Sequence, residues 1–157
     1  MLEIVEWTSG RGVLCQEIMT ELSDWFSEPE VIAACADVAD SLPMFACMDK
    51  DAVAGFVMLR PHLPDAMEIL VIGTRRAYQR RGVGRRLLTA TESFARKSGC
   101  KLLTVKTLAP RGRDEPLYDA TRAFYENNGF LRAEVLTALW DEGSPCLFLV
   151  RPLDGQQ

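Results

Sequence analysis

The segment that most constrains the fold is an apolar run followed by a basic glycine loop and then by an amphipathic stretch. Residues 66–74 (AMEILVIGT) are almost continuously apolar, which predicts a strand buried on both faces. The loop QRRGVGRR occupies residues 79–86. From Val83 to Ala95 apolar residues recur at helical spacing, and Gly99 is suited to end a helix. This order of strand, loop and helix puts the glycines at the N-terminus of a helix.

Glycines at such a junction favour the binding of a phosphate group. They let the backbone approach an anion closely, and the start of the helix offers unpaired N–H groups and the positive end of its dipole. The loop is not a nucleotide-binding GxxxxGK(S/T) motif. It is not a dinucleotide fingerprint either, because GxGxxG requires a third glycine where the chain has Leu87. The pattern predicts an anion site of another kind.

Charge is divided unevenly along the 157 residues, whose net charge is −4. Residues 1–70 carry 13 acidic and three basic side chains, a local sum of −10, whereas residues 71–157 sum to +6. Six arginines fall between residues 75 and 86. A basic cluster in an acidic protein favours a compact anionic ligand over a nucleic acid, whose backbone the rest of the surface would repel. The alternative is a solvated helix face, which the glycines argue against.

The rest of the chain alternates between strand and helix patterns. Hydrophobic residues make up 48% and charged residues 25%, as in an ordinary folded domain. Beyond the central segment we expect strands at residues 2–7, 43–49, 52–60, 101–108, 130–138 and 145–152, and helices at 12–25, 29–40 and 118–128. Residues 109–117 are expected to form a loop. The order predicts one mixed α/β (α+β) domain with a largely antiparallel first half.

Several classes of protein and site are disfavoured by what the sequence lacks. No apolar run approaches the roughly 20 residues that a membrane helix needs. Residues 1–7 (MLEIVEW) lack the basic start and apolar stretch of a secretory signal. The cysteines form neither a CxxC motif nor a cluster with histidine; they are Cys15, Cys35, Cys47, Cys100 and Cys146. We therefore expect a cytoplasmic protein with reduced thiols, without a metal and without a membrane partner.

Two short motifs, in this order, are typical of one protein family. Gln79-x-x-Gly82-x-Gly84 matches the pattern of Gln or Arg, two residues, Gly, one residue, and Gly or Ala at the start of a helix. Residues 125–130 (YENNGF) match the pattern Tyr-x-x-x-Gly-Phe at the end of a short helix. With these two motifs, and with the expected order of elements along nearly its whole length, the chain resembles the GNAT superfamily of acyl-CoA-dependent N-acetyltransferases.

The resemblance implies a particular fold and a division of labour within it. It implies a single N-acetyltransferase domain over residues 1–157, with residues 1–65 forming the acceptor side and residues 66–157 binding acetyl-CoA and forming the C-terminal half. It also implies a mixed sheet of about six to seven strands, flanked by about four helices and with splayed central strands. Homodimers are common in the family, but the sequence leaves the oligomeric state open.

The resemblance also implies where acetyl-CoA, the acyl donor, would bind. Its pyrophosphate would lie on backbone N–H groups from Arg80 to Arg85, and its pantetheine arm would pair with the edge of the preceding strand. The expected cofactor-binding residues are Ile72, Gly73, Thr74, Gln79, Arg80, Arg81, Gly82, Val83, Gly84, Arg85 and Tyr118. Two positions depart from the family pattern, because Tyr118 replaces a frequent Asn that contacts the cofactor and Arg76 replaces a frequent Pro.

Transfer of an acetyl group to an amine needs a base for the amine, a donor for the developing oxyanion and a proton for the leaving thiolate. By the motif match Tyr125 is the expected acid; the alternative is that it packs the short helix. Glu68 interrupts the apolar run, where an unpaired carboxylate is costly, and its position resembles that of a general-base glutamate in the family. It is the expected base, directly or through water; the alternatives are a solvent-facing residue or a partner of an arginine. The resemblance places the oxyanion donor at a backbone N–H near Ile72.

Other side chains are better explained without catalysis. His62 is the only histidine and lies in a loop bounded by prolines, which favours a surface or turn residue. Cys146 begins an apolar strand and is expected in the core, so an acyl-cysteine step is not expected. Trp25 and Phe26 stand at the expected turn between two helices, which borders the acceptor in this family. They belong either to the core or to the wall of the acceptor pocket, and we favour the pocket for one of them.

The acidity of residues 1–70 bears on the acceptor, because this half supplies much of the acceptor side. It predicts a small-molecule or peptide amine that is cationic, such as a polyamine, a lysine-like side chain, an aminoglycoside-like compound or a basic peptide N-terminus. A second hypothesis is a sensor or interaction module that binds acyl-CoA without turnover. A third is nucleic-acid binding through the arginines, which the overall acidity disfavours.

Overall fold

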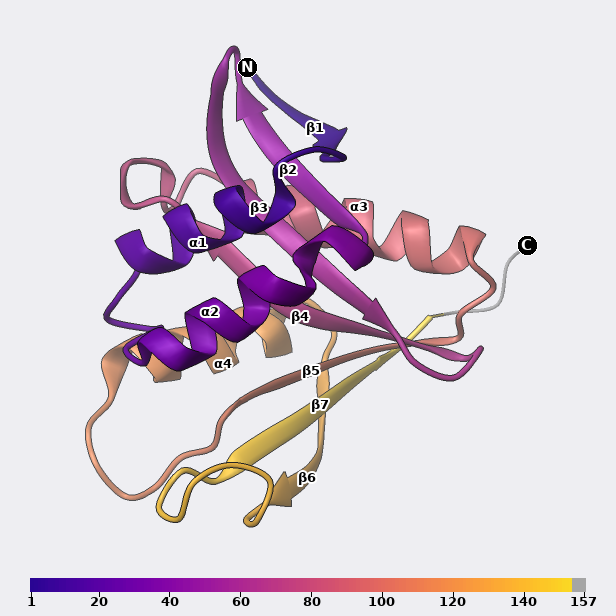
Figure 1. The fold of residues 1–157 in the computed structure, drawn as a ribbon. Helices are drawn as coiled ribbons and strands as arrows, with labels where there is room; N and C mark the ends of the chain where they lie inside the picture. Colours follow the sequence, from indigo (N-terminus) through magenta and orange to yellow (C-terminus); the bar gives the residue numbers. More distant parts are fainter. Residues whose placement is uncertain (154–157) are drawn as a thin grey trace. The chain divides into compact units, whose positions relative to one another are not determined.

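The structure, a computed structural model, describes residues 1–153 and forms seven strands and four α-helices within that range (Figure 1). The elements in chain order are β1 (Leu2–Glu6), α1 (Arg11–Glu21), α2 (Pro29–Val38), η1 (Ala39–Ser41), β2 (Met44–Asp49), β3 (Ala52–Pro61), β4 (Ala66–Thr74), η2 (Arg76–Tyr78), α3 (Val83–Lys97), β5 (Leu102–Leu108), α4 (Pro116–Asn127), β6 (Leu131–Leu136) and β7 (Cys146–Pro152). The strand order is β1-β2-β3-β4-β5-β7-β6. The predicted mixed α/β fold is confirmed, while the splay of its central strands stays a prediction.

The chain divides into two compact units. The first comprises Met1–Arg60 and Ile69–Phe94, and the second comprises Pro61–Glu68 and the chain from Ala95 onward. The boundary falls inside the continuous strand β4, between Glu68 and Ile69. The expected division into an acceptor-side half and a cofactor-binding half stays a prediction.

The first unit is layered, with α1 and α2 on one face of its strands and α3 on the other (Figure 1). Leu14, Ile18 and Leu22 are spaced four residues apart, so they form one buried stripe of α1. They join a core with buried side chains of β2 and β3, among them Phe56. On the opposite face, the ring of Phe45 packs edge-on against Phe94 of α3 at 5.5 Å between centroids. Successive side chains of β2 point to opposite faces, so this strand contributes to the packing on both sides.

A glycine in β3 allows the start of α3 to lie directly on the strands of the first unit. A Cβ at Gly55 would stand 2.7 Å from the carbonyl oxygen of Gly73 and 2.9 Å from Cγ1 of Val83. Side chains do not tolerate such distances, so this position requires glycine. Because Val83 is the first residue of α3, the fit at Gly55 fixes where the glycine loop ends.

The second unit contains an antiparallel set of strands, in which β7 pairs with both β5 and β6. Helix α4 begins at Pro116, two residues before the expected start at 118, because proline suits the first turn of a helix. Its end is close to the expected one, since Gly129 takes a positive φ of 92°. Directly after it, the ring of Phe130 packs edge-on against Tyr125 at 5.5 Å between centroids.

Three features of residues 1–153 bear on the exclusions drawn from the sequence. Within that range no helix is long and apolar enough to cross a membrane. The same residues hold no group of three or more His, Cys, Asp or Glu side chains that could hold a metal ion. All five cysteines are free thiols, of which Cys15, Cys47 and Cys146 are buried and Cys35 and Cys100 are half-buried.

We predict that Gly55→Ala destabilises the protein by about 1–3 kcal/mol, because the added methyl group must displace backbone rather than a flexible side chain. The free energy of unfolding from denaturant titration measures the effect. Ala52→Val is the matched control, since Ala52 is exposed on the same strand and its replacement should stay within about 0.5 kcal/mol. Equal stability of Gly55→Ala and the wild type would contradict the close approach of β3 and α3.

Candidate active site

The end of β4 and the loop after it form a closed turn. The side-chain amide of Gln79 donates a hydrogen bond to the carbonyl oxygen of Thr74 at 3.2 Å. Two residues of the loop have left-handed backbone conformations, Arg80 with φ 64° and Gly82 with φ 81°. Left-handed residues allow neighbouring N–H groups to converge, which is the geometry of anion-binding concavities in protein backbones. The predicted anion loop therefore has a backbone suited to that role.

Helix α3 begins directly after this turn. The N–H of Arg86 donates to the carbonyl oxygen of Gly82 at 3.1 Å, which is the first turn of the helix. The first four N–H groups of a helix have no intrahelical acceptors and attract anions. A Cβ at Gly82 would meet no atom within 4 Å, so the space beside the loop is open. The exposed arginines here are Arg80, Arg81, Arg85 and Arg86.

Side chains of α1 and of the residue after it pack against the strand segment before the loop. Gly73 is buried, and a Cβ there would lie 3.2 Å from Cδ1 of Leu22 and 3.4 Å from Cγ2 of Ile18. Its neighbours Ile72 and Thr74 are half-buried. The expected cofactor-binding residues from Ile72 to Arg85 thus lie in one continuous strand, turn and helix start. Their role in binding stays a prediction.

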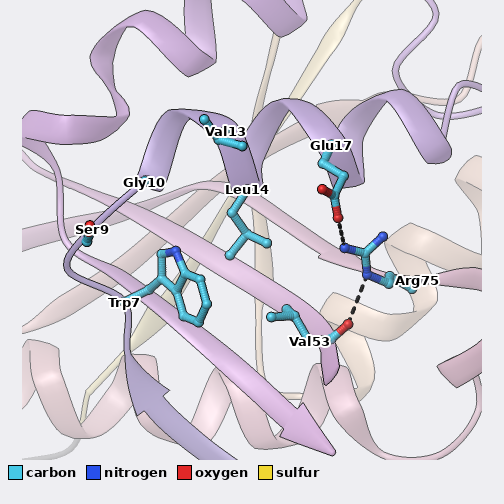
Figure 2. Close-up of a pocket in the computed structure, with 8 residues that line it drawn as sticks. All are labelled: Trp7, Ser9, Gly10, Val13, Leu14, Glu17, Val53 and Arg75. Carbon is cyan, nitrogen blue, oxygen red and sulfur yellow. Dashed lines mark hydrogen bonds and ion pairs between the residues drawn. The ribbon is translucent and has the colours of Figure 1, made fainter. Parts of the chain in front are cut away.

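One arginine of the basic cluster is engaged with α1 rather than free for a ligand. Arg75 donates from Nε to the carbonyl oxygen of Val53 at 2.9 Å and from Nη1 to Glu21 at 2.9 Å. Its Nη2 pairs with Glu17, as Figure 2 shows. Burial and these carboxylates act in opposite directions on the guanidinium, and its pKa is raised on balance. Arg75 therefore joins β3, β4 and α1 in the first unit.

Arg76 is also engaged with α1 and the turn after it. Its guanidinium pairs with Asp24, and its backbone N–H donates to Oε2 of Glu21 at 2.9 Å. The Arg76 guanidinium holds the pKa of Asp24 below its usual range. The Arg76 backbone N–H, together with the Arg75 guanidinium, lowers the pKa of Glu21. Six clustered arginines are therefore not six ligand-binding groups, because long-range ion pairs occupy two of them.

An open pocket of about 470 Å³ lies beside Arg75 in the first unit (Figure 2). Its lining residues are Trp7, Ser9, Gly10, Val13, Leu14, Glu17, Val53 and Arg75. The indole Nε1 of Trp7 is buried and has no hydrogen-bond partner among residues 1–153. No residue that the sequence predicts for the cofactor or the acceptor is in this lining.

Trp25 and Phe26 lie in the turn between α1 and α2. The backbone N–H of each donates to the carbonyl oxygen of Leu22 at 3.0 Å. Both rings are half-buried and pack against the core of the first unit. Each ring therefore has a packing role, and a contact with the acceptor stays a prediction.

Glu68 is buried and has a partner at each oxygen, and all three residues belong to the second unit. Its side chain is 5% exposed. Oε1 lies 2.6 Å from Nε2 of His62, and Oε2 accepts a hydrogen bond from Nζ of Lys106 at 3.0 Å. Neither alternative for Glu68, a solvent-facing residue or a partner of an arginine, describes this arrangement. His62 is on the surface as expected, with 44% of its side chain exposed, but it also contacts the expected base.

Sequence reasoning missed both partners of Glu68. A signal existed for Lys106, which is the one charge in the apolar run LLTVKTL of β5, just as Glu68 is the one charge in β4. Two opposite single charges in consecutive buried strands predict a pair, since neither is stable alone in such a place. No comparable signal existed for His62, because its position depends on the turn before β4.

Tyr125 is buried in the second unit and packs the short helix, which is one of the two roles that the sequence left open. Its ring lies between Phe124, at 5.4 Å, and Phe130, at 5.5 Å between centroids. Burial raises the pKa of the phenol well above its usual range, so the group keeps its proton at physiological pH. Because a raised pKa makes the buried phenol a weaker acid than a free tyrosine, its catalytic role stays a prediction.

Helix α4 also carries a buried arginine that the sequence reading passed over. Arg122 is 4% exposed, and its guanidinium binds the carbonyl oxygen of Leu108 at the end of β5 and the carboxylate of Asp119. It lies three residues before Tyr125, so it fixes the helix that carries the phenol. Tyr118 is half-buried on the same helix, and its expected contact with the cofactor stays a prediction.

A comparison with models of protein families shows to which family the chain belongs. Residues 11–130 match the model of the acetyltransferase (GNAT) family. The chain therefore belongs to the GNAT acetyltransferase family, which is a family of enzymes. A search among curated proteins gave no significant match.

Solved structures show the same fold at low sequence identity. An acetyltransferase of the GNAT family from Desulfovibrio desulfuricans has a TM-score of 0.84 and 20% identity, covering 98% of this chain and 100% of its own. The ribosomal-protein-S18-alanine N-acetyltransferase from Escherichia coli has a TM-score of 0.78 and 19% identity, covering 100% and 97%. A GNAT family acetyltransferase from Elizabethkingia anophelis, with acetyl-CoA bound, has a TM-score of 0.75 and 17% identity, covering 97% and 98%. Their likeness confirms the fold.

We predict that the contact between Glu21 and the two arginines stabilises the protein in a pH-dependent way. Because the folded state lowers the pKa of Glu21, its contribution is present above the unfolded pKa of about 4.3 and is lost as pH falls through the folded value. Glu21→Gln should lower the free energy of unfolding by about 0.5–1 kcal/mol at pH 7 and by less at pH 3. Glu3→Gln, at an exposed position, is the control. A deficit in Glu21→Gln that does not change with pH would refute the pairing.

Proposed function

We propose that this protein is an acetyl-CoA-dependent N-acetyltransferase that moves the acetyl group directly to a primary amine in a ternary complex. The observation that carries the proposal is the turn from Gln79 to Gly84, with its two left-handed residues and its position at the start of α3. Such a backbone binds a pyrophosphate without any special side chain. The family assignment supplies the reaction type.

The residues present fit the acyl donor. The space beside Gly82 is open, and the loop arginines that do not pair with α1 are exposed. In the proposal, backbone N–H groups from Arg80 to Arg85 hold the pyrophosphate, and the segment from Ile72 to Thr74 holds the pantetheine arm. Bound acetyl-CoA supplies a thioester carbonyl for attack by the amine. A related structure from Elizabethkingia anophelis with bound acetyl-CoA supports this choice of donor.

The chain contributes one group for each proton that the reaction must move. Tyr125 is the proposed acid, because its phenol stands at the tyrosine position of the family motif, residues 125–130 (YENNGF). Glu68 is the carboxylate on which the proposed base depends, because it is buried in a strand that continues into the proposed pantetheine segment. Ile72 lies four positions after Glu68 in the same strand. The backbone N–H near Ile72 is the proposed donor to the oxyanion.

The charge distribution supports a cationic acceptor. Residues 1–70 sum to −10, and the exposed Glu28 and Glu30 lie at the end of the turn between α1 and α2 and at the start of α2. A negative surface raises the local concentration of a positively charged amine. The alanine N-acetyltransferase of Escherichia coli shows by its name that this fold accommodates a protein substrate. We therefore include peptide amines with small cationic amines.

We predict that acetyl-CoA raises the melting temperature of the wild type in a saturable way, by mass action on the folded state. In the presence of an accepted amine the protein should release free CoA thiol. Tyr125→Phe should keep the melting shift and lower kcat by about 100-fold, since it removes one hydroxyl and keeps the packed ring. Melting curves and a thiol-release assay measure the two effects.

The two readouts separate the rival functions. A melting shift without thiol release from any amine would favour the non-catalytic acyl-CoA sensor. The absence of any shift at high acetyl-CoA would refute the donor site itself.

We predict that cationic amines are better acceptors than anionic ones. At equal concentration, spermidine, lysine and a basic peptide should give higher kcat/KM than glutamate or an acidic peptide, and the difference should shrink at high salt because screening weakens the attraction. A panel assayed at low and high ionic strength tests this. A preference for glutamate would contradict the proposed role of the acidic surface.

A further inference from the structure

The buried position of Glu68 keeps an amine acceptor from reaching its carboxylate directly. Its side chain is 5% exposed, and each of its oxygens already has a hydrogen-bond partner in the second unit. The more accessible of those partners is His62, at 44% exposure against 28% for Lys106. We infer that His62 is the group that takes the proton from the amine, while Glu68 and Lys106 position it; this inference rests on the proposed function.

The hydrogen bond to Glu68 selects the useful form of the imidazole. Nε2 of His62 lies 2.6 Å from Oε1, and a carboxylate only accepts, so Nε2 carries the hydrogen in this bond. In the neutral ring the other nitrogen, Nδ1, then holds the lone pair. The carboxylate also faces the positive charge that the ring gains when Nδ1 takes a proton. Orientation and charge compensation thus come from one contact.

The backbone holds His62 in place on a short turn. Its N–H donates to the carbonyl oxygen of Ala66 at 3.1 Å, and the N–H of Ala66 donates to that of Leu63 at 3.0 Å. Ala66 is the first residue of β4, which carries Glu68 two residues later. The turn and the strand therefore present the two side chains together, although their contact spans six positions of the chain.

Lys106 completes a row of ammonium, carboxylate and imidazole. Its Nζ lies 3.0 Å from Oε2 of Glu68 and 6.0 Å from the centroid of the Phe148 ring. A buried carboxylate needs such compensation, and the ammonium holds the oxygen that His62 does not use. Cys146 of β7 interacts electrostatically with Lys106 and Glu68, and burial raises its pKa, so it stays a neutral thiol.

The proton and electron balance of the step is simple. The ammonium form of the acceptor gives one proton to Nδ1 of His62, and its nitrogen regains a lone pair. That lone pair forms the new C–N bond as the C–S pair leaves with sulfur. The thiolate takes a proton from Tyr125, the second proton of the nitrogen returns to Tyr125, and His62 gives its proton to solvent. In sum, one proton ends on sulfur and one is released to solvent, so no further reactant is needed.

The decisive experiment compares His62→Ala with the wild type at saturating acetyl-CoA and a cationic amine. We expect kcat to fall by about 100-fold or more, with KM for acetyl-CoA and its melting shift within about threefold of wild type. Added imidazole should raise the kcat of His62→Ala at least tenfold, because it can occupy the space that the histidine side chain leaves. Leu63→Ala is the matched control, since Leu63 is 77% exposed in the same turn and should keep full activity.

Two further variants test the positioning residues. Glu68→Gln should lower kcat, since an amide no longer faces the imidazolium, and imidazole should not rescue it. Lys106→Met should lower kcat less than Glu68→Gln and leave KM for acetyl-CoA within about threefold of wild type, because the carboxylate loses its second partner and keeps His62.

The outcomes distinguish this inference from the proposed function. If the wild type turns over and His62→Ala retains kcat within threefold, the inference fails and the function stands. A loss in His62→Ala that imidazole does not restore also overturns the inference. If the wild type binds acetyl-CoA but acetylates no amine, the proposed function fails, and the role of His62 fails with it.

Discussion

Glu68 brings a negative charge into the interior of the second unit, and the groups around it compensate that charge. The ammonium of Lys106 holds one oxygen, and the imidazole of His62 holds the other. Desolvation of an unpaired carboxylate costs several kcal/mol, so strand β5 and the turn before β4 must both supply a partner. The proposed chemistry therefore rests on a contact that the fold already needs.

The region after β4 shows how one charge cluster serves two purposes. Arg75 and Arg76 tie the end of the strand to the acidic side of α1, and they leave Arg80, Arg81 and Arg85 exposed around the left-handed turn. The ion pairs fix the point where the strand ends, and the glycine fit at Gly55 fixes the point where α3 begins. Between these two fixed points the loop has one short path, and its backbone N–H groups need no ligand to order them.

Local patterns were sufficient to predict most of the fold. Periodicity identified the strands and helices, and two motifs identified the family, because both depend on residues close together in the chain. The partners of the site depend on distance in space: Lys106 is 38 positions from Glu68, and Glu17 is 58 positions from Arg75. For the pair of Lys106 and Glu68, the one local signal is a single charge in each apolar strand. No local pattern predicts the pair of Glu17 and Arg75. Helix α4 starts at Pro116, earlier than the sequence predicts, because the Pro, Gly and charge content of residues 109–117 favours a loop.

The five free thiols have a consequence for an enzyme whose product is itself a thiol. Burial raises the pKa of every one of them, that of Cys15 to about 12, so thiolate is scarce at neutral pH. Thiolate is the form that attacks thioesters and disulfides. The protein is therefore a poor target for acetylation on its own sulfur and for mixed disulfides with oxidised CoA.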